Sequence, residues 1–128
     1  MTPDLQYLTL AGLLCLVQAV IAVIGAIGAV GLPTLAGNRE PAPTIGGWAG
    51  RAARAHQNML ESLIIFAIVI LVAQASGRAN DMTALGAAVF FWARVAYVPV
   101  YLAGIPWVRT GVWGLSIVGI LLVAAQLI

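Results

Sequence analysis

The chain has 128 residues, of which 62% are hydrophobic and 8% are charged, and its formal net charge is +2. Such a small number of polar groups cannot cover the surface of a soluble globule. The composition therefore excludes a soluble domain and indicates an integral membrane protein. The basic residues are all arginines, and they form no basic stripe interleaved with aromatic side chains, which argues against nucleic acid as a partner.

The first predicted helix covers residues 5–32, which carry no charge and exceed the roughly 20 residues that a membrane-spanning helix needs. This apolar run is about twice as long as that of a signal peptide and no basic segment precedes it, so we expect it to stay attached. Its small residues between Ala22 and Gly31 allow a neighbouring helix to approach closely. Cys15, the sole cysteine, is interpreted as a core residue.

Residues 33–50 are predicted to form the one long loop, because prolines and glycines interrupt the helical pattern. The segment from Asn38 to Pro41 within this loop is interpreted as a solvated turn.

Three further helices are predicted over residues 51–76, 81–103 and 107–128, with Asn80 or Asp81 as the N-cap of the second of them. Short connections place consecutive helices antiparallel. The predicted fold class is therefore all-α, an up-down four-helix transmembrane bundle that forms a single domain over residues 1–128.

The arginines predict the orientation of these four helices. Both termini and Arg78 fall on one side of the membrane, whereas Arg39, Arg51, Arg54 and Arg109 fall on the other. By the positive-inside rule the second side, with the long loop, is cytoplasmic and the termini are not. In a bacterial source the membrane would be the inner, or plasma, membrane.

A polar cluster opens the second predicted helix. At about 100° per residue, one stripe about 80° wide contains Arg51, Arg54, Asn58 and Glu61. His56 points almost oppositely, and we interpret it as a hydrogen-bonding residue between helices or at headgroup level rather than as a catalytic base. One histidine, one cysteine and no cluster of carboxylates provide no ligand set for a metal and no Ser-His-Asp arrangement.

The third predicted helix carries a second stripe, with Phe90, Arg94, Tyr97 and Tyr101 on one face. Arg94 is the deepest charge in the chain. Tyr101 fits either a polar cavity shared with Arg94 or the belt of aromatic residues at a membrane interface.

Arg51, Arg54, Arg94 and Arg109 together face a single carboxylate, that of Glu61. Because an unpaired buried charge is expensive, this surplus of positive charge predicts an anionic ligand or a lipid headgroup. Glutathione carries carboxylates, amides and an amine, and it fits this pattern.

Three sequence blocks resemble the MAPEG family, the membrane-associated proteins in eicosanoid and glutathione metabolism, which include the microsomal glutathione transferases. The blocks are Arg51-x-x-Arg54-Ala-His56-x-Asn58-x-x-Glu61 followed by Phe66, Phe90-x-x-x-Arg94-x-x-Tyr97-x-x-x-Tyr101, and Arg109-Thr110. The resemblance covers Trp48 to the C-terminus. The first helix shares only its apolar character with the family, because the segment from Gly28 to Pro33 contains no arginine where family members carry one.

The resemblance implies a homotrimer that binds glutathione as co-substrate between neighbouring subunits, near the cytoplasmic face. Arg54, Asn58 and Glu61 would hold the polar groups of the peptide, and Tyr97 and Tyr101 would add hydroxyl contacts. Arg94 would be a buried structural or site-lining arginine. Arg109 would stabilise the glutathione thiolate and would thus be the catalytic residue.

The sequence leaves open which function this fold serves. The first hypothesis is a membrane glutathione transferase or peroxidase that acts on apolar electrophiles or lipid hydroperoxides. The second is a noncatalytic scaffold or lipid-binding accessory subunit, whose partners would be membrane lipids and a larger membrane complex. A small four-helix multidrug exporter is disfavoured, because such proteins need an acidic residue within the first helix and none lies between Asp4 and Arg39.

Overall fold

A computed structural model describes residues 1–37 and 44–128, and the described residues form helices and no strands. The helices are α1 (Pro3–Val30), α2 (Leu32–Ala36), α3 (Gly47–Ala75), α4 (Asp81–Leu102) and α5 (Pro106–Ala125). All except α2 are long and apolar enough to cross a membrane. The predicted all-α four-helix membrane bundle is thus confirmed, whereas the predicted turn from Asn38 to Pro41, with Arg39, lies outside the described residues.

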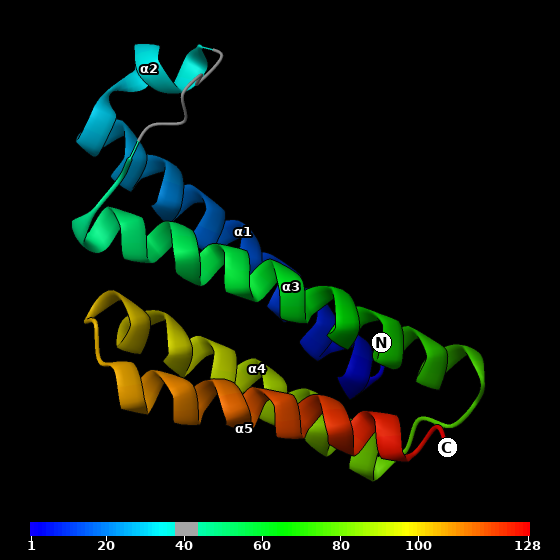
Figure 1. The fold of residues 1–128 in the computed structure, drawn as a ribbon. Coiled ribbons are helices and arrows are strands. Elements are labelled where there is room, and N and C mark those ends of the chain that lie inside the picture. The colour runs from blue at the N-terminus through cyan, green and yellow to red at the C-terminus, as the bar shows by residue number, and fades with distance from the viewer. Residues whose placement is uncertain (38–43) are drawn as a thin grey trace.

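The long helices run as two antiparallel pairs (Figure 1). α1 lies along α3, α4 lies along α5, and both termini are at the end of the bundle remote from α2. α1 also packs on α4, and α3 packs on both α4 and α5. A core of apolar side chains joins the pairs, and within it the rings of Phe66 on α3 and Phe90 on α4 stack with their centroids 4.0 Å apart.

Local capping explains where the helices begin and end. The side chain of Asn80 accepts hydrogen bonds from the backbone of Met82 and Thr83, and the Thr83 hydroxyl accepts one from the Asn80 backbone. This reciprocal capping box satisfies free N–H groups at the start of α4, and it confirms Asn80 rather than Asp81 as the N-cap. α1 ends at Val30 and is capped by Gly31, whose φ of 85° lies in the left-handed region that favours glycine.

The predicted loop over residues 33–50 was too long at both ends. α2 forms directly after Gly31 with Pro33 in its first turn, where proline lacks only an N–H that would be unpaired in any case. α3 starts at Gly47, four residues earlier than predicted, so one glycine of the expected loop begins the helix. The last helix ends at Ala125, short of the predicted end at residue 128.

α4 and α5 approach each other closely at Gly119, where glycine is required. A Cβ atom built on Gly119 would lie 2.6 Å from the Phe90 backbone nitrogen and 2.7 Å from the Gly86 oxygen. No side chain fits at these distances without moving the backbone of α4. Gly111 and Gly114, on the same helix, have nothing within 4 Å of such an atom.

We therefore expect Gly119→Ala to destabilise the fold, by about 1–3 kcal/mol as is usual for overpacking. Gly114→Ala is the matched control, since it makes the same chemical change on α5 in open space and should leave stability unchanged or slightly raised. Thermal unfolding of both variants in detergent measures the difference. Equal midpoints for the two variants would contradict the close α4–α5 contact.

Candidate functional site

The buried guanidinium of Arg94 is the centre of the candidate site. Arg94 lies on α4 and is 1% exposed. Its Nη1 donates a hydrogen bond of 2.9 Å to Oδ1 of Asn58 on α3. Its Nε and Nη2 are buried, and the described residues give neither atom a hydrogen-bond partner. A cation with two free donors is thus held inside an apolar helix bundle, which is a costly arrangement without a further partner.

A line of four side chains, two tyrosines with an arginine at each end, runs from Arg94 to α5. The Cζ atom of Arg94 lies 4.1 Å from the ring centroid of Tyr97, and the rings of Tyr97 and Tyr101 are 5.4 Å apart. The Cζ atom of Arg109 lies 4.8 Å from the centroid of the Tyr101 ring. Each cation is within the range of about 6 Å over which an aromatic face attracts it. We call these four residues the Arg–Tyr line.

The position of Tyr101 decides between the two interpretations of this residue, a polar cavity shared with Arg94 and an aromatic belt at the membrane interface. Tyr101 is 9% exposed and packs with Tyr97 and Ala55 in a small buried cluster between α3 and α4. An interfacial belt residue would instead present its ring to the bilayer. Tyr101 therefore belongs to the same interior region as Arg94.

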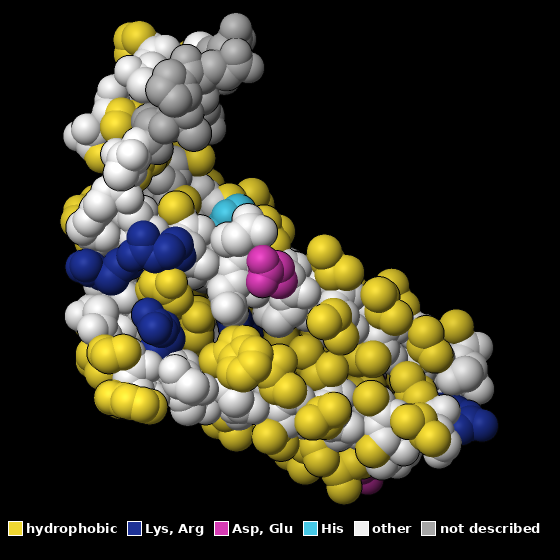
Figure 2. All heavy atoms as spheres, viewed as in Figure 1, with side chains coloured by type: hydrophobic (Ala, Val, Ile, Leu, Met, Phe, Trp, Pro, Cys, Tyr) yellow, Lys and Arg dark blue, Asp and Glu magenta, His cyan; other side chains and the backbone are white. Residues whose placement is uncertain are grey.

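The stripe predicted on α3 divides between the interior and the surface. Asn58 is half-buried and reaches Arg94, whereas Arg54 and Glu61 are exposed. Glu61 accepts a hydrogen bond of 3.4 Å from Gln57. Figure 2 shows arginine side chains gathered at the α2 end of the bundle, with a carboxylate close to them. The structure thus places Arg54 and Glu61 on the outer surface of the subunit and Asn58 at its interior.

Arg51 makes a contact that the sequence did not reveal. Its Nε donates a hydrogen bond of 2.9 Å to the backbone oxygen of Leu102, the last residue of α4. Carbonyls in the last turn of a helix have no partner within the helix and carry partial negative charge, so a cation stabilises them. Arg51 therefore ties the start of α3 to the turn that leads from α4 to α5. The only available signal was its spacing relative to Arg54, which does not identify a backbone partner on another helix.

His56 lies apart from the Arg–Tyr line, as the helical projection predicted. It lines a pocket together with Ala53 and residues of α1 and α2. The described residues offer it no hydrogen-bond partner, so the interhelical hydrogen bond proposed from the sequence is not formed with them. Among all the residues that the structure describes, no group of three or more His, Cys, Asp or Glu side chains could hold a metal ion.

Comparison with known proteins agrees with this architecture. No curated protein matches the chain. The model of one protein family, the MAPEG family, matches residues 5–128, which include all four long helices, the Arg–Tyr line and the arginines of α3. The chain is therefore an integral membrane protein that belongs to the MAPEG family.

Proposed function

We propose that the protein binds glutathione at the Arg–Tyr line and activates its thiol, as a membrane glutathione transferase or peroxidase. The observation that carries this proposal is Arg94, a buried cation with two unpartnered donors. A guanidinium binds a carboxylate through parallel N–H donors, so an anionic ligand would supply what the described residues do not. Membership of a family that includes glutathione-dependent enzymes supports glutathione as that ligand.

Each end of the Arg–Tyr line has a distinct role in this proposal. Arg94 would hold a carboxylate of glutathione inside the bundle, with Tyr97 and Tyr101 offering their hydroxyls along the peptide. Arg109 would lie beside the thiol, where a permanent cation favours the thiolate over the neutral form. Because Arg109 is half-buried, water screens it less than it would screen an arginine on the surface.

The thiolate would then react with an apolar compound that arrives through the bilayer. In a transfer reaction, its sulfur bonds to an electrophilic carbon while the leaving group departs with the electron pair of the broken bond. With a lipid hydroperoxide, the thiolate attacks the terminal peroxide oxygen, and cleavage of the O–O bond leaves a sulfenic acid and a lipid alkoxide, which takes a proton from water to become the alcohol. A second glutathione reduces the sulfenic acid, which yields glutathione disulfide and water.

The exposed members of the site support assembly with a second subunit, and the family resemblance implies that the assembly is a homotrimer. Arg54 and Glu61 face outward from the single subunit, although the resemblance assigns both to glutathione. A second subunit packed on this side of α3 would enclose them with the ligand between the two chains. We propose that the α2 end of the bundle is cytoplasmic, because Arg51 and Arg54 lie near the start of α3 and Arg109 near the start of α5.

A second candidate is a noncatalytic scaffold or lipid-binding accessory subunit of a larger membrane complex. The observation that favours it is the end of α1, where Gly28 to Val30 and the turn at Gly31 provide no cation. Arg39, the next arginine, lies outside the described residues. A site with fewer cations would bind glutathione more weakly while the fold is retained.

Glutathione added to the protein in detergent should produce the ultraviolet absorbance of a thiolate near neutral pH. Arg109→Ala should reduce this absorbance by about tenfold or more, which corresponds to at least one pKa unit of the bound thiol. Arg78→Ala is the control, because Arg78 lies at the other end of the bundle, and it should behave as the unchanged protein does. Equal absorbance in the two variants would remove Arg109 from thiol activation.

Asn58→Asp should place a carboxylate where the amide now meets Arg94. This internal counterion competes with the ligand, so the affinity for glutathione should fall by about tenfold, a loss of about 1.4 kcal/mol. The free energy of unfolding should remain equal or rise, since the buried cation gains a partner.

Gln6→Glu is the control, with the same charge change at an exposed position near the start of α1, at the other end of the bundle. Isothermal titration calorimetry measures all three affinities. Unchanged binding by Asn58→Asp would show that Arg94 does not hold the anion. If the unsubstituted protein gives no saturable heat with glutathione, the scaffold is favoured over the enzyme.

A further inference from the structure

The turn between α4 and α5, residues 103–105, leaves one backbone carbonyl without a backbone donor. The carbonyls of the three residues before Leu102 accept hydrogen bonds from the N–H groups of this turn. Within a helix, the Leu102 carbonyl would accept from the residue four positions later, but that residue is Pro106, which has no N–H. Pro106 suits the first turn of α5, yet the Leu102 oxygen must then be satisfied by another group.

Arg51 of α3 supplies the missing donor. Its Nε donates a hydrogen bond of 2.9 Å to the Leu102 oxygen in a partly buried position. The side chain also lies along the turn, because a Cβ atom built on Gly104 would be 3.7 Å from both Cδ and Nε of Arg51. Gly104 has a φ of 73°, in the left-handed region that favours glycine. Arg51 thus contacts the turn at two points.

This turn joins the last two members of the Arg–Tyr line. Tyr101 lies in the last turn of α4, and Arg109 lies in the first turn of α5. The N–H of Arg109 donates to the oxygen of Ile105, the N-cap of α5, so the direction in which the chain enters α5 determines where Arg109 lies. The 4.8 Å between the Arg109 Cζ atom and the Tyr101 ring centroid therefore depends on the turn that Arg51 holds.

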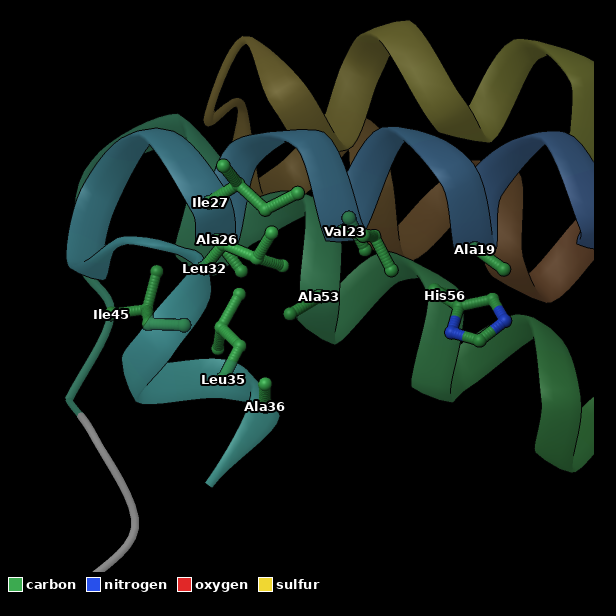
Figure 3. A pocket seen from close by; sticks show the side chains of 11 residues that line it. Ala19, Val23, Ala26, Ile27, Leu32, Leu35, Ala36, Ile45, Ala53 and His56 are labelled. Carbon is green, nitrogen blue, oxygen red and sulfur yellow. The ribbon is translucent and has the colours of Figure 1, made fainter. Parts of the chain in front are cut away.

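Among the described residues, Arg51 has no hydrogen-bond or ion-pair partner other than this turn. The face of α3 with Ala53 and His56 lines an aliphatic pocket with α1 and α2 (Figure 3), and at about 100° per residue Arg51 lies on the opposite face. The carboxylate of Glu61, further along α3, accepts its hydrogen bond from Gln57. The side chain of Arg51 is therefore fixed by the backbone of the turn and not by an opposite charge.

We propose that Arg51 is a positioning residue, which holds the α4–α5 turn so that Arg109 lies over Tyr101 and beside the thiol of bound glutathione. This inference rests on the proposed function, which places the thiol at Arg109. It differs from the interpretation of the sequence, in which the Arg51 guanidinium binds the anion through its charge. In the positioning role the Nε–H donor is required and the positive charge is not.

Two substitutions separate the donor from the charge. In Arg51→Gln, Nε2 follows Cδ as Nε does in arginine, so a neutral side chain can still donate to the Leu102 oxygen. Arg51→Met keeps an unbranched stem but offers neither an N–H donor nor a charge. Arg78→Met is the matched control, because Arg78 is exposed and follows α3 at the other end of the bundle.

The thiolate absorbance of saturating glutathione near neutral pH, measured with the full chain in detergent, is the first readout. Arg51→Met should reduce this absorbance by about threefold or more, because a displaced cation stabilises the thiolate less. Arg51→Gln and Arg78→Met should keep the absorbance of the unsubstituted protein. In an Arg109→Ala background, Arg51→Met should cause no further loss, since the cation that it positions is absent.

Hydrogen–deuterium exchange without glutathione is the second readout. The amides of residues 107–110 should exchange faster in Arg51→Met and at the original rate in Arg51→Gln. Exchange in the middle of α1 should be unchanged in both variants, which shows that the bundle is folded. Should Arg51→Met not fold, Arg51→Gln alone decides, because loss of its thiolate absorbance would show that the charge is needed.

Two results would overturn the proposal. Equal loss of thiolate absorbance in Arg51→Gln and Arg51→Met would assign Arg51 to direct binding of the anion. Unchanged absorbance or unchanged exchange of residues 107–110 in Arg51→Met would show that the bond to Leu102 does not position Arg109. An unsubstituted protein that forms no thiolate would instead reject the proposed function, and the exchange rates would then decide whether Arg51 holds the turn.

Discussion

The burial of one guanidinium constrains the rest of this structure. Arg94 is 1% exposed within a span whose neighbouring side chains are mostly apolar. Even lenient scales assign an arginine at the centre of a membrane helix a cost of about 2.5 to 3.5 kcal/mol. The bundle offsets part of that cost through the amide of Asn58 and the ring of Tyr97. The remaining donors have no partner among the described residues, and the anion of the proposed function would supply one.

The second cation of the site depends on helix packing rather than on local sequence. Arg109 lies over Tyr101 because α5 packs tightly on α4, and the contact at Gly119 permits that approach. Arg51 holds the intervening turn through the carbonyl of Leu102. The spacing between the two ends of the Arg–Tyr line is therefore set by backbone contacts, and a substitution far from any ligand can alter it.

The sequence predicted the helices and their polar faces but not the partners of individual side chains. Hydropathy and spacing located the four spans, and the composition of the turn limited the cap of α4 to Asn80 or Asp81. The bond between Asn58 and Arg94 joins residues 36 positions apart, and helical periodicity assigns each to a face without showing which faces meet. α2 was not predicted, for a different reason. Its five residues are too few to show a helical period of hydrophobicity, and Pro33 suggested a break in a helix instead of its first turn.

α3 separates two chemical environments, and this explains why His56 and Asn58 differ although they are near neighbours in the sequence. The face with Asn58 turns inward to a buried cation, where a polar group stabilises the fold and orients a ligand. The face with His56 turns to an aliphatic pocket beside α1 and α2. A helix rotates about its axis as one unit. A ligand that fixes one face of α3 therefore also limits how far the side chains on the opposite face can move. An occupant of that pocket would thus help hold Asn58 at the distance at which it meets Arg94.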